Sequence, residues 1–431
     1  MARKPGKFAI AFIFITVTIN MIGLGVVMPV MPKLIMDVTG ESLADAAKWG
    51  GLFSAVYALM QFIMMPVIGG LSDRFGRRPV LLTSMAAYSL DFLAMAVAPM
   101  IGVIVVARIF AGAFAATFST ANAYIADVTP PEKRAENFGL IGAAFGLGFI
   151  IGPGIGGYLG GALGPRAPFY FVAALGAANF VFGYFVLPET LKPENRRKFE
   201  WARANAFGAF KQFAKYPIML PVAGVLLLSQ LAHWTYPSVW AYYAEEKFLW
   251  TEQHIGASLM FVGLTSAIVQ GGLTRIVIPR TGERAAALFA FCVTTISYVG
   301  FAFVGSGKMV YALIAFSALG GLAAPAIQGI MSRTVPDNVQ GELQGAAGAI
   351  MSISMILGPF LTTQIFAAFT SPEKPIVIGG VTLSETGAPF YFPGAPFIFS
   401  AALEVCAIAM LFWAFTRIRR PREASATPAG Q

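Results

Sequence analysis

Charged residues are scarce in this sequence. Asp, Glu, Lys and Arg make up 12% of its 431 residues, whereas soluble globular proteins carry about 25%. Hydrophobic residues make up 57%, and the mean hydropathy is +0.70. A soluble domain of this length leaves too much of its surface in water to bury so much apolar area. The composition therefore excludes a soluble protein and indicates that lipid surrounds most of the chain.

Cysteine and the common catalytic motifs are also scarce. The two cysteines, Cys292 and Cys406, lie in separate apolar runs, which excludes a disulfide framework or a thiolate metal site. The sequence has no Gly-x-x-x-x-Gly-Lys-Ser/Thr run, so ATP-driven transport is not expected. No nucleophile–base constellation stands out either. We expect no enzyme activity, no metal and no cofactor.

Long apolar stretches are abundant instead. A membrane-spanning helix needs about 20 mostly apolar residues, and twelve stretches meet this length. They lie near 8–32, 49–68, 80–98, 101–126, 137–161, 168–187, 217–244, 255–274, 285–305, 308–332, 343–369 and 396–416. The first is too long for a signal peptide and has no cleavage site after it. The sequence thus predicts an all-α polytopic membrane protein.

The placement of basic residues predicts the orientation. If the N-terminus is cytoplasmic, 23 of the 30 Lys and Arg residues fall in cytoplasmic segments, six fall outside, and Arg108 lies within a span. Cytoplasmic loops carry the excess of Lys and Arg. We therefore expect both termini to be cytoplasmic in the inner (cytoplasmic) membrane. The net charge of +9 then reflects topology and not a nucleic-acid partner.

The chain divides into two related halves. Gly-Pro at 152–153 recurs at 358–359, and Pro130 and Glu136 recur as Pro336 and Glu342 at the same offset of 206 residues. Repeated bundles of this kind are typical of transporters that rock about a central site. The expected domains are a six-helix bundle, a cytoplasmic linker, a second pseudosymmetric six-helix bundle and a tail. Their bounds are 1–187, 188–216, 217–416 and 417–431.

The linker has two interpretations. Phe199, Phe207, Phe210 and Phe213 recur at helical spacing opposite basic residues, which suits an amphipathic helix lying in the membrane plane. A plain tether is the alternative.

A charged motif connects the second and third spans. Residues 69–79 read Gly-Gly-Leu-Ser-Asp-Arg-Phe-Gly-Arg-Arg-Pro. Asp73 can accept backbone N–H groups at a helix end or pair with Arg77. Such a cluster can form a latch that is made in one conformation and broken in another. We assign Asp73 and Arg77 to a latch and the other arginines to membrane anchoring. In the second half Arg275 aligns with Asp73, so any latch is asymmetric.

The fifth span carries a second motif, which predicts a bend or a close helix contact. Proline removes a backbone hydrogen bond, and glycines allow a neighbouring helix to approach. The residues of this helix-bend motif are Gly148, Gly152, Pro153, Gly156 and Gly157.

These two motifs, with Arg108 and Gly112 in the fourth span, resemble the major facilitator superfamily and its twelve-span drug/proton antiporters. Further segments resemble the tetracycline-efflux branch. They are 28–32, 57–61, 89–91, 125–127 and 325–332. The resemblance implies proton-driven export. The sequence departs from this branch at three positions expected to handle the proton and a metal-chelated drug, where it has Asn20, Ser266 and Thr294.

Four ionisable side chains fall at membrane depth, where they are costly and indicate function. Asp91 and Arg108 lie about eight residues on either side of the turn between spans 3 and 4, so the helical rise brings them to one depth. A coupling pair that opens when Asp91 binds a proton and a permanent structural ion pair are both open. His233 and Glu404 are the other candidates for proton coupling.

Uncharged polar residues at membrane depth need partners, because hydrocarbon offers none. Together with His233 and Trp234 they are candidates for a substrate cavity. The uncharged polar candidates are Asn20, Gln61, Asn122, Gln230, Gln270 and Gln328.

The sequence therefore predicts a monomeric, proton-coupled exporter of small amphipathic compounds. Its expected partners are a small-molecule substrate, protons and the lipid bilayer. The alternatives are an exporter of an endogenous metabolite or lipid-like precursor, and a non-transporting sensor of the same fold.

The outer loop near 376–383 is expected to form a small β-hairpin with a Gly-Gly turn.

Overall fold

The computed structural model describes residues 7–115, 117–130, 133–201, 219–334, 340–371, 376–378, 381–384, 387–388 and 390–418. Among these described residues, the first half of the chain contains seven α-helices. They are α1 (Lys7–Thr39), α2 (Leu43–Phe75), α3 (Arg77–Val97), α4 (Ile101–Ala113), α5 (Thr117–Val128), α6 (Arg134–Leu163) and α7 (Ala167–Val186). A short 3-10 turn, η2 (Pro193–Asn195), follows.

The second half repeats this plan with two short irregular helices inserted. Its elements are α9 (Met219–Phe248), α10 (Glu252–Ile268), the π-helix η4 (Val269–Leu273), α11 (Thr274–Thr281), α12 (Glu283–Phe303), α13 (Gly307–Ser317), the 3-10 helix η5 (Ala318–Leu322), α14 (Ala323–Thr334), α15 (Gln340–Thr370) and α16 (Ala395–Ile418). Strands β1 (Ile376–Ile378) and β2 (Val381–Ser384) pair antiparallel between α15 and α16.

The expected membrane helices are present. Within the described residues, eleven helical stretches are long and apolar enough to cross a membrane, and α9 lies where the remaining span was predicted. Three spans are less regular than the sequence suggested. The span predicted at 101–126 consists of α4 and α5, the span predicted at 255–274 contains the π-helix η4 between α10 and α11, and the span predicted at 308–332 consists of α13, η5 and α14.

The same glycine-dependent turn recurs in both halves. Gly76 joins α2 to α3 with φ 111°, and Gly282 joins α11 to α12 with φ 80°. Residues other than glycine adopt such backbone angles only at a steric cost, because they carry a Cβ atom. The repeat detected in the sequence therefore corresponds to a repeated sharp reversal between helices.

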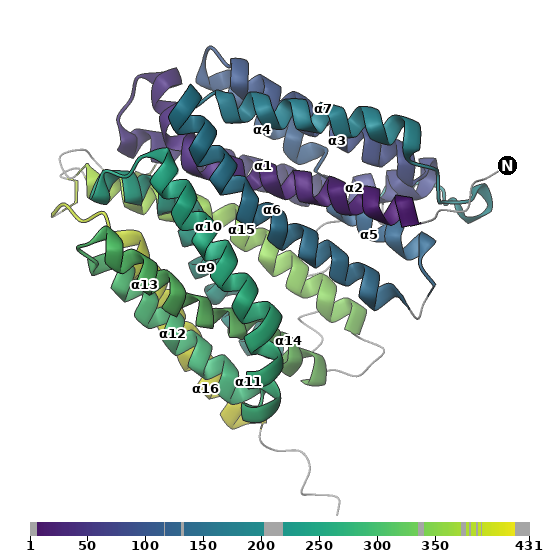
Figure 1. Ribbon diagram of the computed structural model, residues 1–431. Helices are drawn as coiled ribbons and strands as arrows, with labels where there is room; N and C mark the ends of the chain where they lie inside the picture. The colour runs from purple at the N-terminus through teal and green to yellow at the C-terminus, as the bar shows by residue number, and fades with distance from the viewer. Residues whose placement is uncertain are drawn as a thin grey trace, which may run out of the picture.

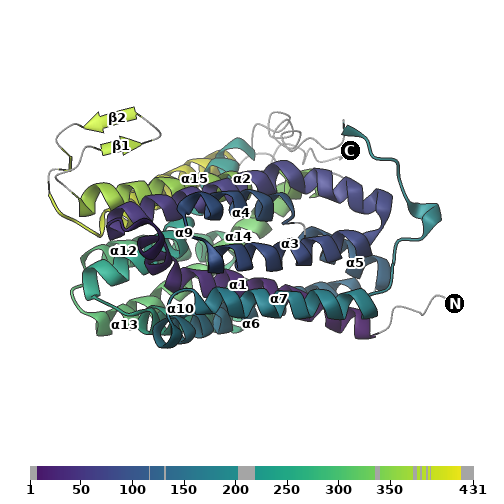
Figure 2. The same cartoon turned by 90° about the horizontal axis from the view of Figure 1, so that it is seen from above.

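The helices form two bundles that meet along α6, α10, α2 and α15 (Figure 1). One end of the molecule carries the β1–β2 hairpin, and the other carries the start of the segment after α7 (Figure 2). We call these the hairpin end and the linker end. The bundles diverge toward the linker end (Figure 1).

The bundles pack most tightly near the hairpin end. A Cβ on Gly157 of α6 would overlap the backbone carbonyl of Glu252 on α10, and a Cβ on Gly51 of α2 would overlap Thr363 of α15. Nearer the linker end, a Cβ on Gly146 or on Gly348 would meet no atom within 4 Å. The hairpin end is therefore closed by helix contacts that glycine makes possible.

Of the two interpretations of the linker, the amphipathic helix is wrong for its first residue, Phe199. Phe199 lies in the non-helical segment after η2. Its ring packs against Gly70 of α2: a Cβ atom added to Gly70 would lie 3.0 Å from two ring carbons of Phe199. Phe207, Phe210 and Phe213 lie outside the described residues. The β-hairpin predicted near 376–383 is confirmed in β1 and β2, while its Gly-Gly turn lies outside the described residues.

Candidate functional site

The structure brings Asp91 and Arg108 together inside the first bundle. Asp91 lies on α3 and Arg108 on α4. The Nε of Arg108 donates to Oδ1 of Asp91 at 3.1 Å, and a second guanidinium nitrogen contacts Oδ2. The side chain of Asp91 is 4% exposed and that of Arg108 is 12% exposed. A charge in lipid is tolerated far better when it is paired and hydrogen-bonded, so the predicted pairing is confirmed.

Aromatic rings surround the guanidinium of this pair. Its carbon lies 5.5 Å from the ring centroid of Tyr57 and 6.0 Å from that of Phe92. Such cation–π contacts are stronger where water is excluded. Gln61, one helical turn after Tyr57 on α2, donates to the carbonyl of Ala115 at 3.3 Å, in the break between α4 and α5. The pair therefore lies beside an interrupted helix.

The other two proposed proton carriers lie in the second bundle and do not join this pair. Glu404 on α16 is 2% exposed and accepts a hydrogen bond from Ser229 of α9 at 3.4 Å. His233 exposes its side chain on α9. The structure thus presents one buried ion pair and two separate titratable residues.

None of the other predicted cavity residues is buried. Asn122, Gln270 and Gln328 are exposed, and the remaining ones are partly exposed. Asn20 donates to the carbonyl of Thr16 on its own helix at 2.9 Å. Trp234 packs against Gly358 of α15. Gln270 lies in the π-helix η4, a kind of irregularity that is frequent at functional sites. These residues are available to a ligand, but no described contact joins them into one site.

The predicted Asp73–Arg77 contact exists at the linker end. A guanidinium nitrogen of Arg77 lies 2.7 Å from Oδ1 of Asp73, and its Nε lies 3.2 Å from Oδ2 of Asp127. Glu189 accepts from the backbone nitrogens of Arg77 and Arg78 at 2.9 and 3.2 Å, which caps the start of α3. Asp127 and Glu189 were not predicted as partners, although Asp127 lies in the segment 125–127 that resembles the tetracycline-efflux branch.

A charge-reversed version of this contact lies in the second bundle. At the repeat offset, Arg77 corresponds to Glu283 and Asp127 to Arg333. Glu283 and Arg333 form an ion pair at 3.0 Å. The two halves therefore keep the same helix-to-helix contact with the signs of the charges exchanged.

The helix-bend motif makes close contacts on two sides of α6, which continues through Pro153. Gly148, Gly152 and Gly156 pack against α1, where added Cβ atoms would overlap atoms of that helix. Gly157 packs against α10 in the other bundle. The motif therefore joins helices within the first bundle and also across the two bundles.

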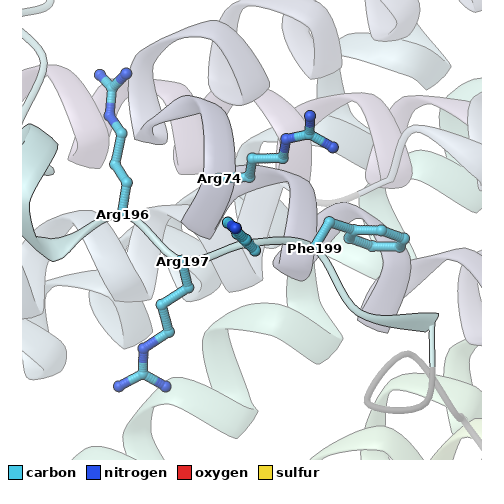
Figure 3. Close-up of a pocket in the computed structure, with 5 residues that line it drawn as sticks. Arg74, Arg196, Arg197 and Phe199 are labelled. Atoms are coloured by element: carbon cyan, nitrogen blue, oxygen red, sulfur yellow. The ribbon is translucent and has the colours of Figure 1, made fainter.

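A basic cavity of about 390 Å³ opens at the linker end, lined by Arg74, Arg196, Arg197, Lys198 and Phe199. The backbone nitrogen of Arg197 donates to the carbonyl of Asp73 at 3.1 Å, which fixes the extended segment beside α2. The labelled arginine side chains point in different directions (Figure 3). They do not converge on one atom, so this surface lacks the geometry of a focused substrate site.

Within the described ranges, no group of three or more His, Cys, Asp or Glu side chains is arranged to hold a metal ion. Two bundles of apolar helices, closed against each other at one end and carrying a buried ion pair, define the class as a polytopic membrane transport protein.

The family comparison agrees with this class. The model described as Major Facilitator Superfamily matches residues 13–359, and the chain belongs to that superfamily of small-molecule transporters. It is 38% identical over 363 residues to the tetracycline resistance protein, class C, of Escherichia coli, covering 84% of this chain and 91% of the relative. It is 33% identical to the class B protein of Escherichia coli, covering 86% and 90%.

Solved structures show the same fold. The inward-facing, unoccupied structure of a bacterial homolog of the human lysosomal transporter Spinster has a TM-score of 0.76 at 16% identity, covering 96% of this chain and 98% of that one. The human organic anion transporter MFSD10 has a TM-score of 0.66 at 18% identity, covering 95% and 100%.

Proposed function

We propose that the protein is a proton-coupled exporter of small amphipathic compounds that works by alternating access. The buried Asp91–Arg108 pair is the observation that carries this proposal. Protonation of Asp91 removes one charge of the pair, which changes its electrostatic energy and frees Arg108. The names of the relatives support export of drugs.

The proposal includes an orientation and a division of the chain. The linker end, where α1 begins and α16 ends, faces the cytoplasm because the basic loops lie there, and the hairpin end faces outward across the inner membrane. Both termini are then cytoplasmic. The bundles at 1–187 and 217–416 move against each other in a monomer, connected by 188–216 and followed by a tail at 417–431. Asp73 and Arg77 act as the latch between conformations.

Tetracycline itself is a weaker candidate than the names of the relatives suggest. Asn20 donates its amide to its own helix, and Thr294 donates to the carbonyl of Ala290 at 2.9 Å. An amide and a hydroxyl are poorer ligands for Mg²⁺ than carboxylates. We therefore expect substrates that need no metal, held by the polar residues of α1, α5, α9 and α14.

The test uses purified protein in proteoliposomes with an imposed pH gradient. Tetracycline with and without Mg²⁺ and ethidium serve as probes. We expect accumulation of an amphipathic probe that a protonophore abolishes. Asp91→Asn should lower proton-driven transport by about tenfold or more, because an intramembrane carboxyl is a functional group. Glu194→Gln, at an exposed carboxylate outside the ion pair and the interface between the bundles, is the control.

Three results would each contradict a part of the proposal. Full proton-driven transport by Asp91→Asn would leave the ion pair with a structural role alone. If neither protons nor the probe move in vesicles that contain the protein in the correct orientation, the result would favour a non-transporting sensor. Strong Mg²⁺-dependent exchange of tetracycline would instead overturn the substrate class that we propose.

A further inference from the structure

An ion pair connects the two bundles at the hairpin end. The Nζ of Lys33 on α1 lies 2.9 Å from Oε1 of Glu252 on α10. The Glu252 side chain is 8% exposed, whereas that of Lys33 is 52% exposed. The ion pairs Asp91–Arg108 and Glu283–Arg333 each stay within one bundle. The Lys33–Glu252 contact therefore depends on how the bundles are placed relative to each other.

Backbone packing makes this dependence strict. Gly157 of α6 lies directly against the carbonyl of Glu252, and Gly256 of α10 lies against the carbonyl of Pro153. Helices in such close contact move apart as units, since an intermediate separation loses packing without admitting solvent. Any opening of the hairpin end carries Glu252 away from Lys33.

A further carboxyl, Glu245, lies at this interface beyond the apolar stretch of α9. It is partly buried and interacts electrostatically with Glu252, Lys33 and Glu246. Asp37 on α1 also interacts electrostatically with Lys33. Glu246 accepts a hydrogen bond from the hydroxyl of Tyr391 at 2.6 Å. With Glu245 neutral, Lys33 and Glu252 balance; with Glu245 ionised, the closed interface holds an uncompensated negative charge.

We propose that Lys33, Glu252 and Glu245 form a proton-dependent gate at the hairpin end, in which the Lys33–Glu252 pair fastens the bundles together and Glu245 binds a proton as they close. This proposal rests on the proposed function. The gate would act in the return step of the antiporter: after the substrate leaves on the outer side, Glu245 binds a proton from that side, and the hairpin end closes.

The direction of the pH effect follows from linkage. Burial, and then the charge of Glu252, raises the pKa of Glu245 from 4.5 to about 7 in the closed structure. When the bundles separate, water returns and the pKa falls toward its ordinary value. The closed form thus binds the proton more tightly, so closure is favoured at low pH. Closure weakens as pH rises from about 4.5 to about 7 and then levels off.

The experiment measures the gate without any substrate. Cys292 and Cys406 are replaced by Ser, and nitroxide labels are placed at Leu163→Cys and Lys308→Cys, which are exposed near the hairpin end on opposite bundles. Double electron–electron resonance on the full chain in lipid nanodiscs then gives the distance distribution at pH 5.5 and pH 8.5.

We expect a larger short-distance population at pH 5.5 than at pH 8.5. Glu245→Gln should keep the short population at both pH values, because its side chain cannot ionise. Lys33→Met should reduce the short population at both, and the charge exchange Lys33→Glu with Glu252→Lys should restore it. Glu41→Gln, at an exposed carboxylate outside the cluster, should behave like the parent protein.

A Glu245→Gln protein with the parent's pH response would overturn the role of Glu245. Glu245→Asp, which keeps the carboxyl, is the control for a folding defect and should keep the pH response. A Lys33→Met protein with unchanged distances would overturn the ion pair as a fastening. Proton-driven transport with no pH response of the distances would refute the gate while leaving the proposed function intact. A responsive gate without transport would do the reverse.

Discussion

Asp91 and Arg108 are stable at membrane depth because each neutralises the other. Both side chains are almost fully buried and joined by two contacts. Removing one member of a buried pair leaves a single charge without compensation, whereas removing both leaves none. The structural part of their role is therefore measurable separately from transport.

We expect Asp91→Asn and Arg108→Gln each to lower the free energy of unfolding by about 3–5 kcal/mol. The double variant should lose much less than the sum of the two. Thermal unfolding of the purified proteins in one detergent, arranged as a double-mutant cycle, measures the coupling. Arg333→Ala is the control: Arg333 is 80% exposed in its ion pair, so its loss should cost at most about 1 kcal/mol. Additive losses at 91 and 108 would show that the two charges do not stabilise each other.

At the scale of elements, α6 holds the molecule together through its glycines. It packs against α1 on one side and against α10 of the other bundle on another. Membrane helices associate by close packing of small residues, since lipid leaves no hydrophobic driving force between them. A side chain added at such a contact must push two helices apart, while one added elsewhere on α6 need not.

This difference predicts opposite effects of two similar substitutions in α6. Gly157→Ala places a Cβ against the carbonyl of Glu252 and should destabilise the closed hairpin end by about 1–3 kcal/mol, as overpacking does. Gly146→Ala meets no atom within 4 Å and should be neutral or stabilise by about 0.5–1 kcal/mol, because alanine favours the helix. Unfolding midpoints and hairpin-end distances of both proteins test this. Equal effects would contradict the packing that we describe.

At the scale of the whole molecule, orientation gives direction to the transport cycle. Lys198 is exposed near the linker end and Lys308 near the hairpin end. In a cysteine-free background, a membrane-impermeant maleimide added to intact cells should label Lys308→Cys and spare Lys198→Cys. Permeabilised cells should show labelling of both. Labelling of Lys198→Cys in intact cells would reverse the orientation and, with it, the outward direction of the gate.

Much of this arrangement is predictable from the sequence, because local rules decide it. A long apolar stretch forms a spanning helix whatever its neighbours are. The offset of 206 residues that relates the two halves also separates Gly76 from Gly282, where the structure repeats the turn. Asp91 and Arg108 were predictable as partners because a short turn connects their helices, and the helical rise then sets their depth. Asp73 and Arg77, one helical turn apart, were predictable in the same way.

The remaining contacts depend on how distant helices pack. Asp127, Glu189 and Glu252 lie at helix ends, where a sequence shows solvated charges and not partners. Their partners come from helices far away along the chain. The sequence alone determined that the chain spans a membrane in two related halves with charges held at depth. Only the tertiary structure decided that the hairpin end is closed, and that Lys33 meets Glu252 there beside Glu245, because that contact exists only while the two bundles are packed together.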